Sequence, residues 1–398
     1  MYFSLILFLS ILIISFICSK SNIFSPSVLT SGIWFVVILL YILFGGELNK
    51  LTDKFLTAIS IWVTLFCISS LFAQSLAQKK REITEPSPLA RNILYYFSLL
   101  TFPLLILEAY KIISLGASTN WMSDLRMASI GALKEINIED TNPFYVVVWL
   151  VSYFIELMFY SNKNKKRVYI LFFMYAAFGF FSMGKLHFLI LFLGTIFILY
   201  SKKIIRIKHV FFGGILLLFI FFSIQSLRSR TNVNVHKNKL LELYILSPAP
   251  AFETIKPNST KQSGENVFRI FYAIQYKLGL TKTKPIDPLL NFTYVGVGTN
   301  TYTVLYPFYK DFGLTGIGIF AIILGLLFGG IFKKVENGDI LYIIIYSLFL
   351  YEIIMQYGAE MFFTNLSLNL KRIIIAILPF LITKYELFSL KKRLNEKE

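Results

Sequence analysis

The sequence predicts an all-α polytopic integral membrane protein, on the basis of its composition, its apolar runs and the placement of its charges. Of its 398 residues, 56% are hydrophobic and only 15% are charged, whereas a soluble globular domain has about 25% charged residues. The formal net charge is +17, and many of the Lys and Arg residues lie in short clusters between long apolar runs. This distribution is typical of cytoplasmic loops between membrane spans. It argues against a soluble enzyme, a disordered chain and a nucleic-acid-binding module.

The apolar runs define the predicted spans. A spanning helix needs roughly 20 mainly apolar residues, and about eleven runs fit that description. The first run lacks the positively charged start of a signal peptide, so we interpret it as a retained helix. Gly184-Lys185 is expected to form a tight hairpin at a membrane face, because a lysine at the bilayer centre is costly. The predicted spans are 2–18, 27–45, 55–76, 93–114, 144–161, 168–184, 186–201, 210–226, 314–332, 340–357 and 373–389.

The basic clusters set the predicted orientation. With these spans, all five clusters fall on one side of the membrane, which the positive-inside rule makes cytoplasmic. The whole chain, 1–398, is then a single transmembrane domain with a cytoplasmic C-terminus. The clusters are Lys79-Lys80-Arg81, Lys163 with Lys165-Lys166-Arg167, Lys202-Lys203 with Arg206 and Lys208, Lys333-Lys334, and Lys391-Lys392-Arg393.

Two segments on the opposite, outer face are too long to be simple connectors. The medium one is 115–143 and the long one is 227–313. The prolines and polar stretches of the long segment indicate exposure to water. Within it, apolar residues with helical spacing predict an amphipathic helix near 264–279, with Ser263 as its N-cap. We expect this helix to lie on the membrane surface or over a cavity.

Basic residues of the outer face are the first functional candidates, because a guanidinium binds phosphate bidentately and stays charged. Arg228 and Arg230 are expected at headgroup depth, as phosphate ligands or as snorkelling anchors. Arg126 is either a phosphate ligand or a solvated loop residue paired with Asp124. Lys185 is either a turn residue or a second phosphate contact. The outer-face arginines are Arg126, Arg228, Arg230, Arg269 and Arg372.

Aromatic and acidic residues extend the candidate set. Arg269, Tyr272 and Tyr276 share one face of the predicted amphipathic helix, where they either bind sugars or form a solvated polar face. Asp311 precedes a predicted span, and it is either a general base for a hydroxyl group or a cap of the helix N-terminus.

Acidic residues inside predicted spans are functional candidates by default. Glu108, Glu156 and Glu352 either mark a polar cavity or lie near span ends. Lys111 is a suitable partner for Glu108 on the same helix face. Glu360 lies just outside the tenth span.

The sequence predicts no metal, nucleotide or cofactor site. Its three histidines are scattered, and Cys18 and Cys67 lie in apolar runs without metal-ligand spacing. Gly296-Val-Gly298 lacks the third glycine and the strand–helix setting of a dinucleotide fingerprint.

One stretch resembles a known family. Val297-Gly-Thr-Asn-Thr-Tyr-Thr-Val-Leu-Tyr-Pro-Phe-Tyr-Lys-Asp-Phe-Gly-Leu-Thr-Gly316, followed by an apolar span, resembles the Wzy-type oligosaccharide repeat-unit polymerases. The order of spans and outer segments is similar as well, as are the Asp-Leu-Arg126 element, the Gly184-Lys185 hairpin and the arginines after the eighth span. Many members carry arginine at the hairpin, where this chain has Lys185.

The resemblance implies a metal-independent glycosyltransferase of the membrane-embedded GT-C type. Such enzymes act on undecaprenyl-pyrophosphate-linked glycans at the outer face of the bacterial inner membrane, in the biosynthesis of O-antigen or capsule. They need no cofactor. Expected partners are the lipid-linked glycans and membrane lipids, with a chain-length regulator and a flippase of the same pathway, and no nucleic acid.

The resulting hypothesis assigns roles to individual residues. Arg228 or Arg230, helped by Arg126, neutralises the leaving pyrophosphate. Asp311 or another outer carboxylate activates the acceptor hydroxyl. The tyrosines expected to hold sugar rings are Tyr272, Tyr276, Tyr306 and Tyr309.

Three alternatives stay open at this point. A flippase or other transporter would line a central path with charges and would not need a long outer segment. An O-antigen ligase of similar architecture would use a histidine of the long outer segment, where this chain offers His236. A membrane scaffold would not need the arginines of the outer segments.

Overall fold

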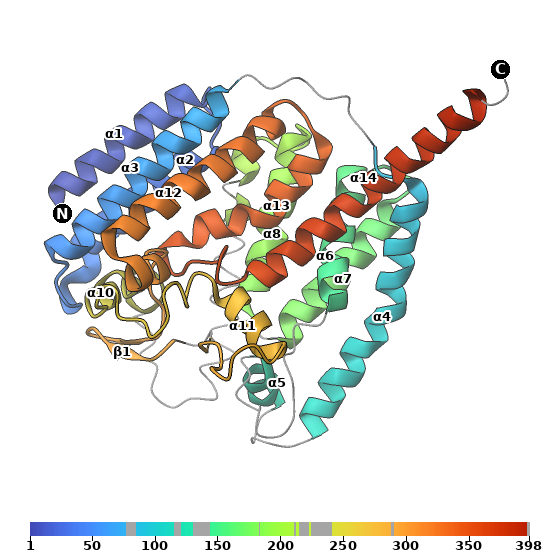
Figure 1. Cartoon of the computed structure of the whole chain (residues 1–398). Helices are drawn as coiled ribbons and strands as arrows, with labels where there is room; N and C mark the ends of the chain where they lie inside the picture. Colours follow the sequence, from blue (N-terminus) through green and yellow to red (C-terminus); the bar gives the residue numbers. More distant parts are fainter. Residues whose placement is uncertain are drawn as a thin grey trace. The chain divides into compact units, whose positions relative to one another are not determined.

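The computed structural model describes most of the chain as helix (Figure 1). The chain divides into two compact units, each built from separate stretches of sequence. Unit 1 consists of Met1–Lys80, His236–Asn337 and Glu352–Asn369, and unit 2 of Arg81–Val235, Gly338–Tyr351 and Leu370–Glu398. The residues that the structure describes are 1–76, 85–114, 121–129, 144–182, 184–210, 212–214, 223, 241–287 and 290–395.

The elements of the two units are as follows. Unit 1 contains α1 (Tyr2–Cys18), α2 (Pro26–Phe44), η1 (Gly45–Glu47), α3 (Asp53–Ser75), η4 (Glu242–Leu246), α10 (Pro248–Glu253), α11 (Arg269–Lys277), β1 (Thr293–Tyr294), β2 (Gly298–Thr299), α12 (Tyr306–Glu336) and η5 (Met355–Tyr357). Unit 2 contains α4 (Pro88–Ser114), α5 (Trp121–Ser129), α6 (Phe144–Met158), α7 (Lys165–Phe181), α8 (Lys185–Ser201), and most of α13 (Ile340–Ile354) and α14 (Leu366–Asn395).

Six helices of the described part are long and apolar enough to cross a membrane. Three shorter apolar helices, α1, α6 and α8, accompany them. The structure is therefore compatible with the predicted all-α membrane protein, while the count of about eleven spans stays a prediction. The six candidates are Pro26–Glu47, Asp53–Ser75, Pro88–Ser114, Tyr306–Glu336, Ile340–Tyr357 and Leu366–Thr383.

The expected break between two apolar runs is present. α7 ends at Phe181 and α8 begins at Lys185, so the break at Gly184-Lys185 is confirmed, while its place at a membrane face stays a prediction. The predicted span 210–226 lies largely outside the described residues. Of the medium outer segment, the structure describes the helix α5.

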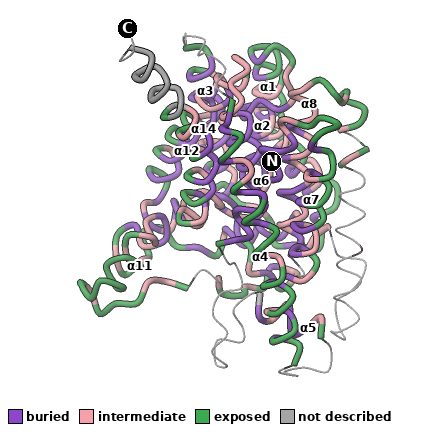
Figure 2. The backbone as a smooth tube through the Cα atoms, turned by 90° about the vertical axis from the view of Figure 1, so that its right-hand side faces the viewer, coloured by how far each residue is buried: buried purple, intermediate pink, exposed green. Residues whose placement is uncertain are grey.

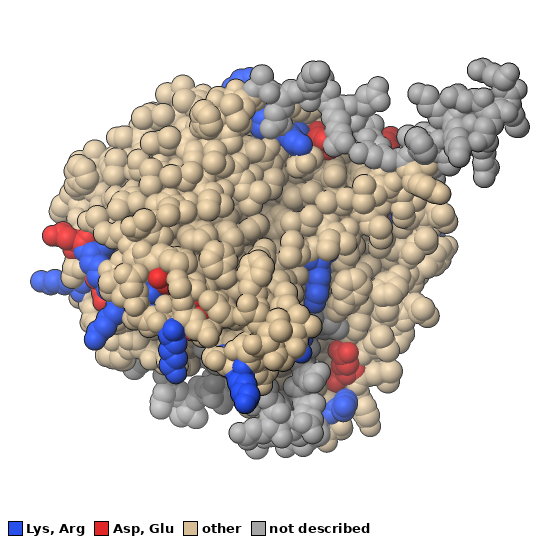
Figure 3. Space-filling view, in the orientation of Figure 1, with Lys and Arg blue, Asp and Glu red and all other residues tan. Residues whose placement is uncertain are grey.

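Helices α3 and α12 form the centre of unit 1. α3 carries no Lys, Arg, Asp or Glu beyond its first two residues, and α12 carries none between Phe312 and Phe332. The surface over the middle of α12 in Figure 3 is accordingly uncharged. A Cβ at Gly325 would lie 2.0 Å from Ser69 Oγ, and one at Gly329 would lie 2.3 Å from the Ser70 carbonyl oxygen. Two glycines four residues apart thus allow the close helix approach that is common in membrane proteins.

A buried glutamine links three parts of unit 1. Gln356 Oε1 accepts hydrogen bonds from Trp62 Nε1 at 3.0 Å and from Trp34 Nε1 at 3.4 Å. Gln356 Nε2 donates to Thr30 Oγ1 at 3.1 Å. A buried amide is costly unless it is hydrogen-bonded, so this glutamine specifies how α2, α3 and η5 meet.

The long outer segment is folded where the structure describes it. α10 is buried from Pro248 to Phe252, so the interpretation of its prolines as marks of exposure to water is wrong at Pro248 and Pro250. Proline is compatible with the first turn of a helix, where the missing N–H has no intrahelical partner anyway.

A lysine of α3 fastens α10. Lys54 Nζ donates to the carbonyl oxygens of Glu253 at 2.8 Å and Ile255 at 2.5 Å, which satisfies the end of that helix. In return, the Glu253 carboxylate accepts from Thr52 N at 2.7 Å and from Thr52 Oγ1 at 2.8 Å. The outer segment is therefore tied to the start of a candidate span.

The predicted amphipathic helix near 264–279 is shorter than expected and starts later, since α11 begins at Arg269. Ser263 does not cap it. Instead, its carbonyl oxygen accepts a hydrogen bond from Tyr272 Oη at 2.7 Å. The reason for the later start lies at Gly264, whose φ of 74° departs from the helical path and favours glycine.

A small antiparallel hairpin, β1–β2, was not predicted. Gly296 in its turn has a φ of 95°, and a Cβ there would lie 2.3 Å from the Glu47 carbonyl oxygen. Gly296-Val-Gly298 therefore serves a tight turn that touches η1.

Two of the acids in predicted spans have structural partners in unit 2. Arg91 Nε and Nη2 donate to the two oxygens of Glu156 at 3.1 and 2.9 Å, and Asn164 Nδ2 donates to Oε2 at 2.8 Å. Glu108 Oε2 accepts from Tyr145 Oη at 2.8 Å. Among the described residues it forms no ion pair with Lys111, contrary to expectation.

Two further acids belong to unit 1. Glu352 Oε1 accepts from Asn369 Nδ2 at 2.8 Å. The Glu360 carboxylate accepts backbone N–H groups of Phe362, Phe363 and Thr364 at 2.7, 2.9 and 2.8 Å. Burial raises the pKa of the Glu360 carboxyl, while these N–H donors lower it.

Candidate functional site

Two arginines of unit 2 act on one histidine, and a lysine begins the helix that carries this histidine. Arg126 lies in α5, Lys185 is the first residue of α8, and Arg372 lies near the start of α14. The charges of Arg372 and Arg126 both act on the ring of His187, and Lys185 lies two positions before that histidine. We call Arg126, Lys185, His187 and Arg372 the basic cluster.

Two cations of the basic cluster are buried. Arg372 is 4% exposed and Lys185 is 8% exposed. Arg372 Nη1 donates to Tyr351 Oη at 2.8 Å, and its guanidinium lies 5.3 Å from the centroid of that ring. Bringing cations together away from water is costly. This arrangement favours an anionic ligand.

The start of α8 adds to the positive potential. The first N–H groups of a helix have no intrahelical partner and favour anions. Lys185 in this first turn opposes the helix dipole, at a typical cost of about 0.3–1 kcal/mol. A basic residue at this place is therefore unfavourable for the helix alone and favourable for an anion bound there.

Local packing holds the histidine and α5 in place. The ring centroid of His187 lies 4.5 Å from that of Phe178, and Tyr175 Oη lies 3.5 Å from Nδ1. A Cβ at Gly184 would lie 2.6 Å from His187 Cδ2, so glycine leaves room for the ring. On α5, Leu125 and Ala128 are buried in a cluster with Ala109 and Ile112 of α4.

Asp124 lies on the same helix as Arg126. It is 1% exposed, and its Oδ1 has no hydrogen-bond partner in the described part of the chain. The alternative of a solvated loop pair therefore does not fit, because both residues are helical and this carboxylate is buried.

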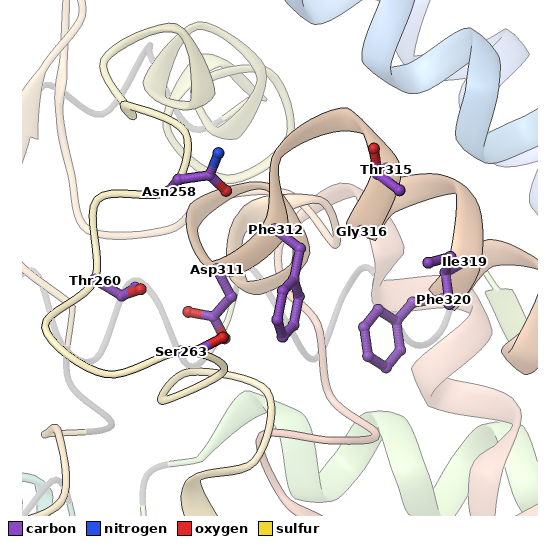
Figure 4. A pocket seen from close by; sticks show the side chains of 9 residues that line it. All are labelled: Asn258, Thr260, Ser263, Asp311, Phe312, Thr315, Gly316, Ile319 and Phe320. Carbon is purple, nitrogen blue, oxygen red and sulfur yellow. The ribbon is translucent and has the colours of Figure 1, made fainter.

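A second polar site lies in unit 1, where a pocket of about 700 Å³ opens beside a kink of α12 (Figure 4). The kink is at Gly313, whose φ of 65° and ψ of −152° favour glycine. Phe312 and Phe320 extend from α12 with ring centroids 6.0 Å apart. The lining residues are Asn258, Thr260, Ser263, Asp311, Phe312, Thr315, Gly316, Ile319 and Phe320.

Asp311 at this pocket holds the outer segment in place. Its Oδ2 accepts from Asn266 N at 3.0 Å and from Val267 N at 2.9 Å, and its Oδ1 accepts from Asn266 Nδ2 at 2.5 Å. These donors lie ahead of α11, so the carboxylate holds a distant segment and does not cap its own helix. A general base needs an oxygen directed at the acceptor hydroxyl, whereas both oxygens here already accept N–H groups.

The residues expected to bind sugars are spread over unit 1. Arg269 Nε donates to the Ile286 carbonyl oxygen at 2.8 Å. Tyr272 reaches the pocket rim through its hydrogen bond to Ser263. Tyr276 is 38% exposed.

Tyr306 and Tyr309 do not line the pocket. Tyr306 Oη accepts from Lys310 Nζ at 2.7 Å. The Tyr309 ring lies 4.9 Å from that of Phe252 and 5.3 Å from Lys54 Nζ. Tyr309 thus packs α12 against α10 and α3, whereas the hydrogen bond of Tyr306 stays within α12.

Several sequence candidates cannot be placed. Arg228, Arg230 and His236 lie outside the described residues. Arg126 and Lys185 both belong to unit 2, whereas Asp311, Arg269 and the four candidate tyrosines belong to unit 1.

Sequence reasoning did not assign a role to His187 or Arg372. Two signals were available, since His187 follows the hairpin lysine by two positions and Arg372 is a charge at the start of the last apolar run. Among the described residues, no group of three or more His, Cys, Asp and Glu side chains is arranged to hold a metal ion.

Comparisons with protein-family models, with curated proteins and with solved structures found no match for this chain. The resemblance to the Wzy-type polymerases therefore rests on the sequence motifs alone.

Proposed function

We propose that this chain is a metal-independent membrane glycosyltransferase of the Wzy type. It would polymerise undecaprenyl-pyrophosphate-linked oligosaccharide repeat units at the outer face of the bacterial inner membrane, with its C-terminus in the cytoplasm. The observation that supports the proposal most is the basic cluster, in which arginines of α5 and α14 act on His187 of α8 and the buried Lys185 begins that same helix. Guanidinium groups bind phosphate bidentately.

In the proposed reaction, a hydroxyl oxygen of the acceptor glycan attacks the anomeric carbon of the donor glycan. The bond between that carbon and the phosphate oxygen breaks, and the undecaprenyl pyrophosphate leaves with its electron pair. Arg126, Lys185 and Arg372 stabilise the charge that develops on the leaving group. A preorganised donor of this kind typically contributes about 2.7–4 kcal/mol. Arg228 and Arg230 keep the same role in the proposal.

The hydroxyl proton must pass to a base. Asp311 remains the candidate for this role because it borders the pocket of unit 1, whose hydroxyl and amide groups suit a sugar. Its two oxygens already accept three N–H groups from the outer segment, so neither is directed solely at an acceptor hydroxyl. The proposal therefore rests on charge stabilisation more than on general base catalysis.

The experiment that tests the proposal is the glycan pattern of a deletion strain carrying plasmid-borne variants. We expect single repeat units and no polymer at the cell surface without the gene, and polymer again with the intact chain. Arg126→Gln and Arg372→Gln should fail to restore polymer, whereas the exposed Arg206→Gln should restore it.

Other outcomes of this experiment point to the alternatives. Absence of any repeat unit from the surface would indicate a flippase. Polymer that is made but not joined to the lipid A core would indicate a ligase. Restoration of full-length polymer by a membrane-inserted Arg126→Gln/Arg372→Gln double variant would overturn the role of the basic cluster.

A further inference from the structure

Helix α11 and the segment after it carry an exposed apolar face in unit 1. Phe271, Ile274 and Leu278 are 56%, 47% and 68% exposed. Their spacing of three and four residues places them on one side of the helix. In Figure 2, α11 and the segment after it are coloured as exposed along most of their length.

The end of α11 extends this face. Gly279 has a φ of 72°, its N–H donates to the Tyr276 carbonyl oxygen at 3.1 Å, and Leu280 N donates to the Gln275 carbonyl oxygen at 2.9 Å. This pair of bonds is a Schellman motif, in which the residue after the glycine turns back toward the last helical turn. Leu280, 74% exposed, thereby joins the apolar side of the helix.

The start of α11 is fixed to a candidate membrane span. Val267 is fully buried, and the Phe268 ring lies 6.3 Å from that of Phe312 and 6.1 Å from that of Phe320, both in α12. Because α12 is long and apolar enough to cross the membrane, a helix held at its early turns lies close to the point where it enters the bilayer.

Basic residues accompany the apolar face. Lys277, Lys282 and Lys284 are all exposed, and Asp287 is the exposed acid of the same segment. Arg269 Nε binds the Ile286 carbonyl oxygen, so the returning chain lies beside the start of α11. An apolar face with lysines next to it matches the chemistry of a bilayer surface with anionic headgroups.

We propose that residues 269–284 form an interfacial anchor in the outer leaflet. The apolar side chains Phe271, Ile274, Leu278 and Leu280 insert below the headgroups, and the three lysines contact anionic lipid. The anchor then holds the pocket of unit 1 at headgroup depth. This inference does not depend on glycosyl transfer, since it concerns only where α11 lies.

The test uses the full-length protein in lipid nanodiscs. In a Cys18→Ser background, which leaves only the buried Cys67, Ile274→Cys is labelled with an environment-sensitive fluorophore. Tyr276→Cys is the matched control, because Tyr276 is 38% exposed on the same helix but lies on its polar side, with Arg269 and Tyr272. We expect blue-shifted emission and strong quenching by spin-labelled lipid at position 274, and quenching by aqueous iodide at position 276.

Two results would overturn the anchor. One is equal lipid quenching at positions 274 and 276. The other is a blue shift at 274 without lipid quenching, which would mean that protein covers the face. Phe271→Cys serves as a second reporter, so a disturbance specific to position 274 does not decide the result.

Lipid composition tests the role of the lysines. We compare nanodiscs of phosphatidylcholine alone with nanodiscs that also contain phosphatidylglycerol. Phosphatidylglycerol should at least double the lipid quenching at position 274, and a Lys277→Gln/Lys282→Gln/Lys284→Gln variant should lose that increase. If phosphatidylglycerol does not increase the lipid quenching, or if the increase persists in the lysine variant, the proposed contact between the lysines and anionic headgroups is wrong.

Discussion

The basic cluster of unit 2 and the pocket of unit 1 differ in the groups that surround their charged side chains. At the pocket, Asp311 receives three N–H donors from the outer segment, so its charge is balanced within the fold. In the basic cluster, Arg126 and Arg372 bring like charges to one histidine. A satisfied buried charge makes a structure specific. A gathering of like charges at a buried site is instead a mark of function.

Substitutions in the two regions are therefore expected to affect different properties, folding in one and the reaction in the other. Loss of Asp311 should first disturb folding of the outer segment, because its hydrogen bonds are internal. Loss of a cation from the basic cluster should mainly disturb the reaction, because the proposed role of these side chains is to stabilise the leaving group.

The largest expected effect comes from Arg372→Gln. Removal of one preorganised charge should lower polymerisation by about 10²–10³-fold, while the melting temperature stays the same or rises. The measurement is conversion of lipid-linked repeat units by purified protein in nanodiscs, with Arg206→Gln as the control. Unchanged turnover together with a lower melting temperature would make Arg372 a structural residue, and the contrast between the regions would disappear.

Asp311→Asn tests the other side of the comparison. The amide would direct an NH₂ group at backbone N–H donors, and such mismatched buried groups cost about 1–3 kcal/mol. We expect faster proteolysis within 256–267 and a loss of activity below about tenfold, as a consequence of local unfolding.

A different result for Asp311→Asn would make it the general base. General bases typically contribute about 10²–10⁴-fold, so a loss of that size with unchanged proteolysis would assign the proton transfer to this residue. Asn266→Ala is the matched control, since it removes one donor to the carboxylate and leaves the carboxylate in place.

These two regions also differ in how far the sequence predicts them. Apolar length predicted the long helices, and the lysine at the Gly184-Lys185 break predicted a hairpin. By contrast, α10 contains two prolines and depends on Lys54, which lies far away in the sequence. Such an element is fixed by tertiary contacts that no local pattern contains.

The residues of the candidate site also differ in how far the sequence predicts them. Arg126 and Lys185 were identified because arginine and lysine on an outer face suit phosphate. Arg372 joins them only through the packing of α14 in unit 2, so the sequence could name the residue but not its neighbours. Conversely, three of the tyrosines chosen for their chemistry, Tyr272, Tyr306 and Tyr309, have structural partners. Spacing along a helix does not reveal what faces each side chain.

Gly184→Ala tests how tightly the histidine is held. A Cβ there would lie 2.6 Å from His187 Cδ2, and overpacking of this kind costs about 1–3 kcal/mol. We expect the ring to shift and activity to fall roughly tenfold, the equivalent of about 1.4 kcal/mol. Gly214→Ala is the control in the same unit, because a Cβ at Gly214 would meet no atom of the described residues within 4 Å. Equal activity of the two variants would remove His187 from the site.

The smallest effect is expected for Tyr351→Phe. The phenyl ring still lies under the guanidinium of Arg372, and only the hydroxyl that accepts its hydrogen bond at 2.8 Å is removed. A hydrogen bond of this kind contributes about 0.5–1.5 kcal/mol, so turnover should fall a few-fold with the melting temperature nearly unchanged. Because the hydroxyl orients the guanidinium and does not touch the phosphate, the loss should be absent in an Arg372→Gln background. A full additional loss in that background would mean that Tyr351 acts on the substrate directly, and not by orienting Arg372.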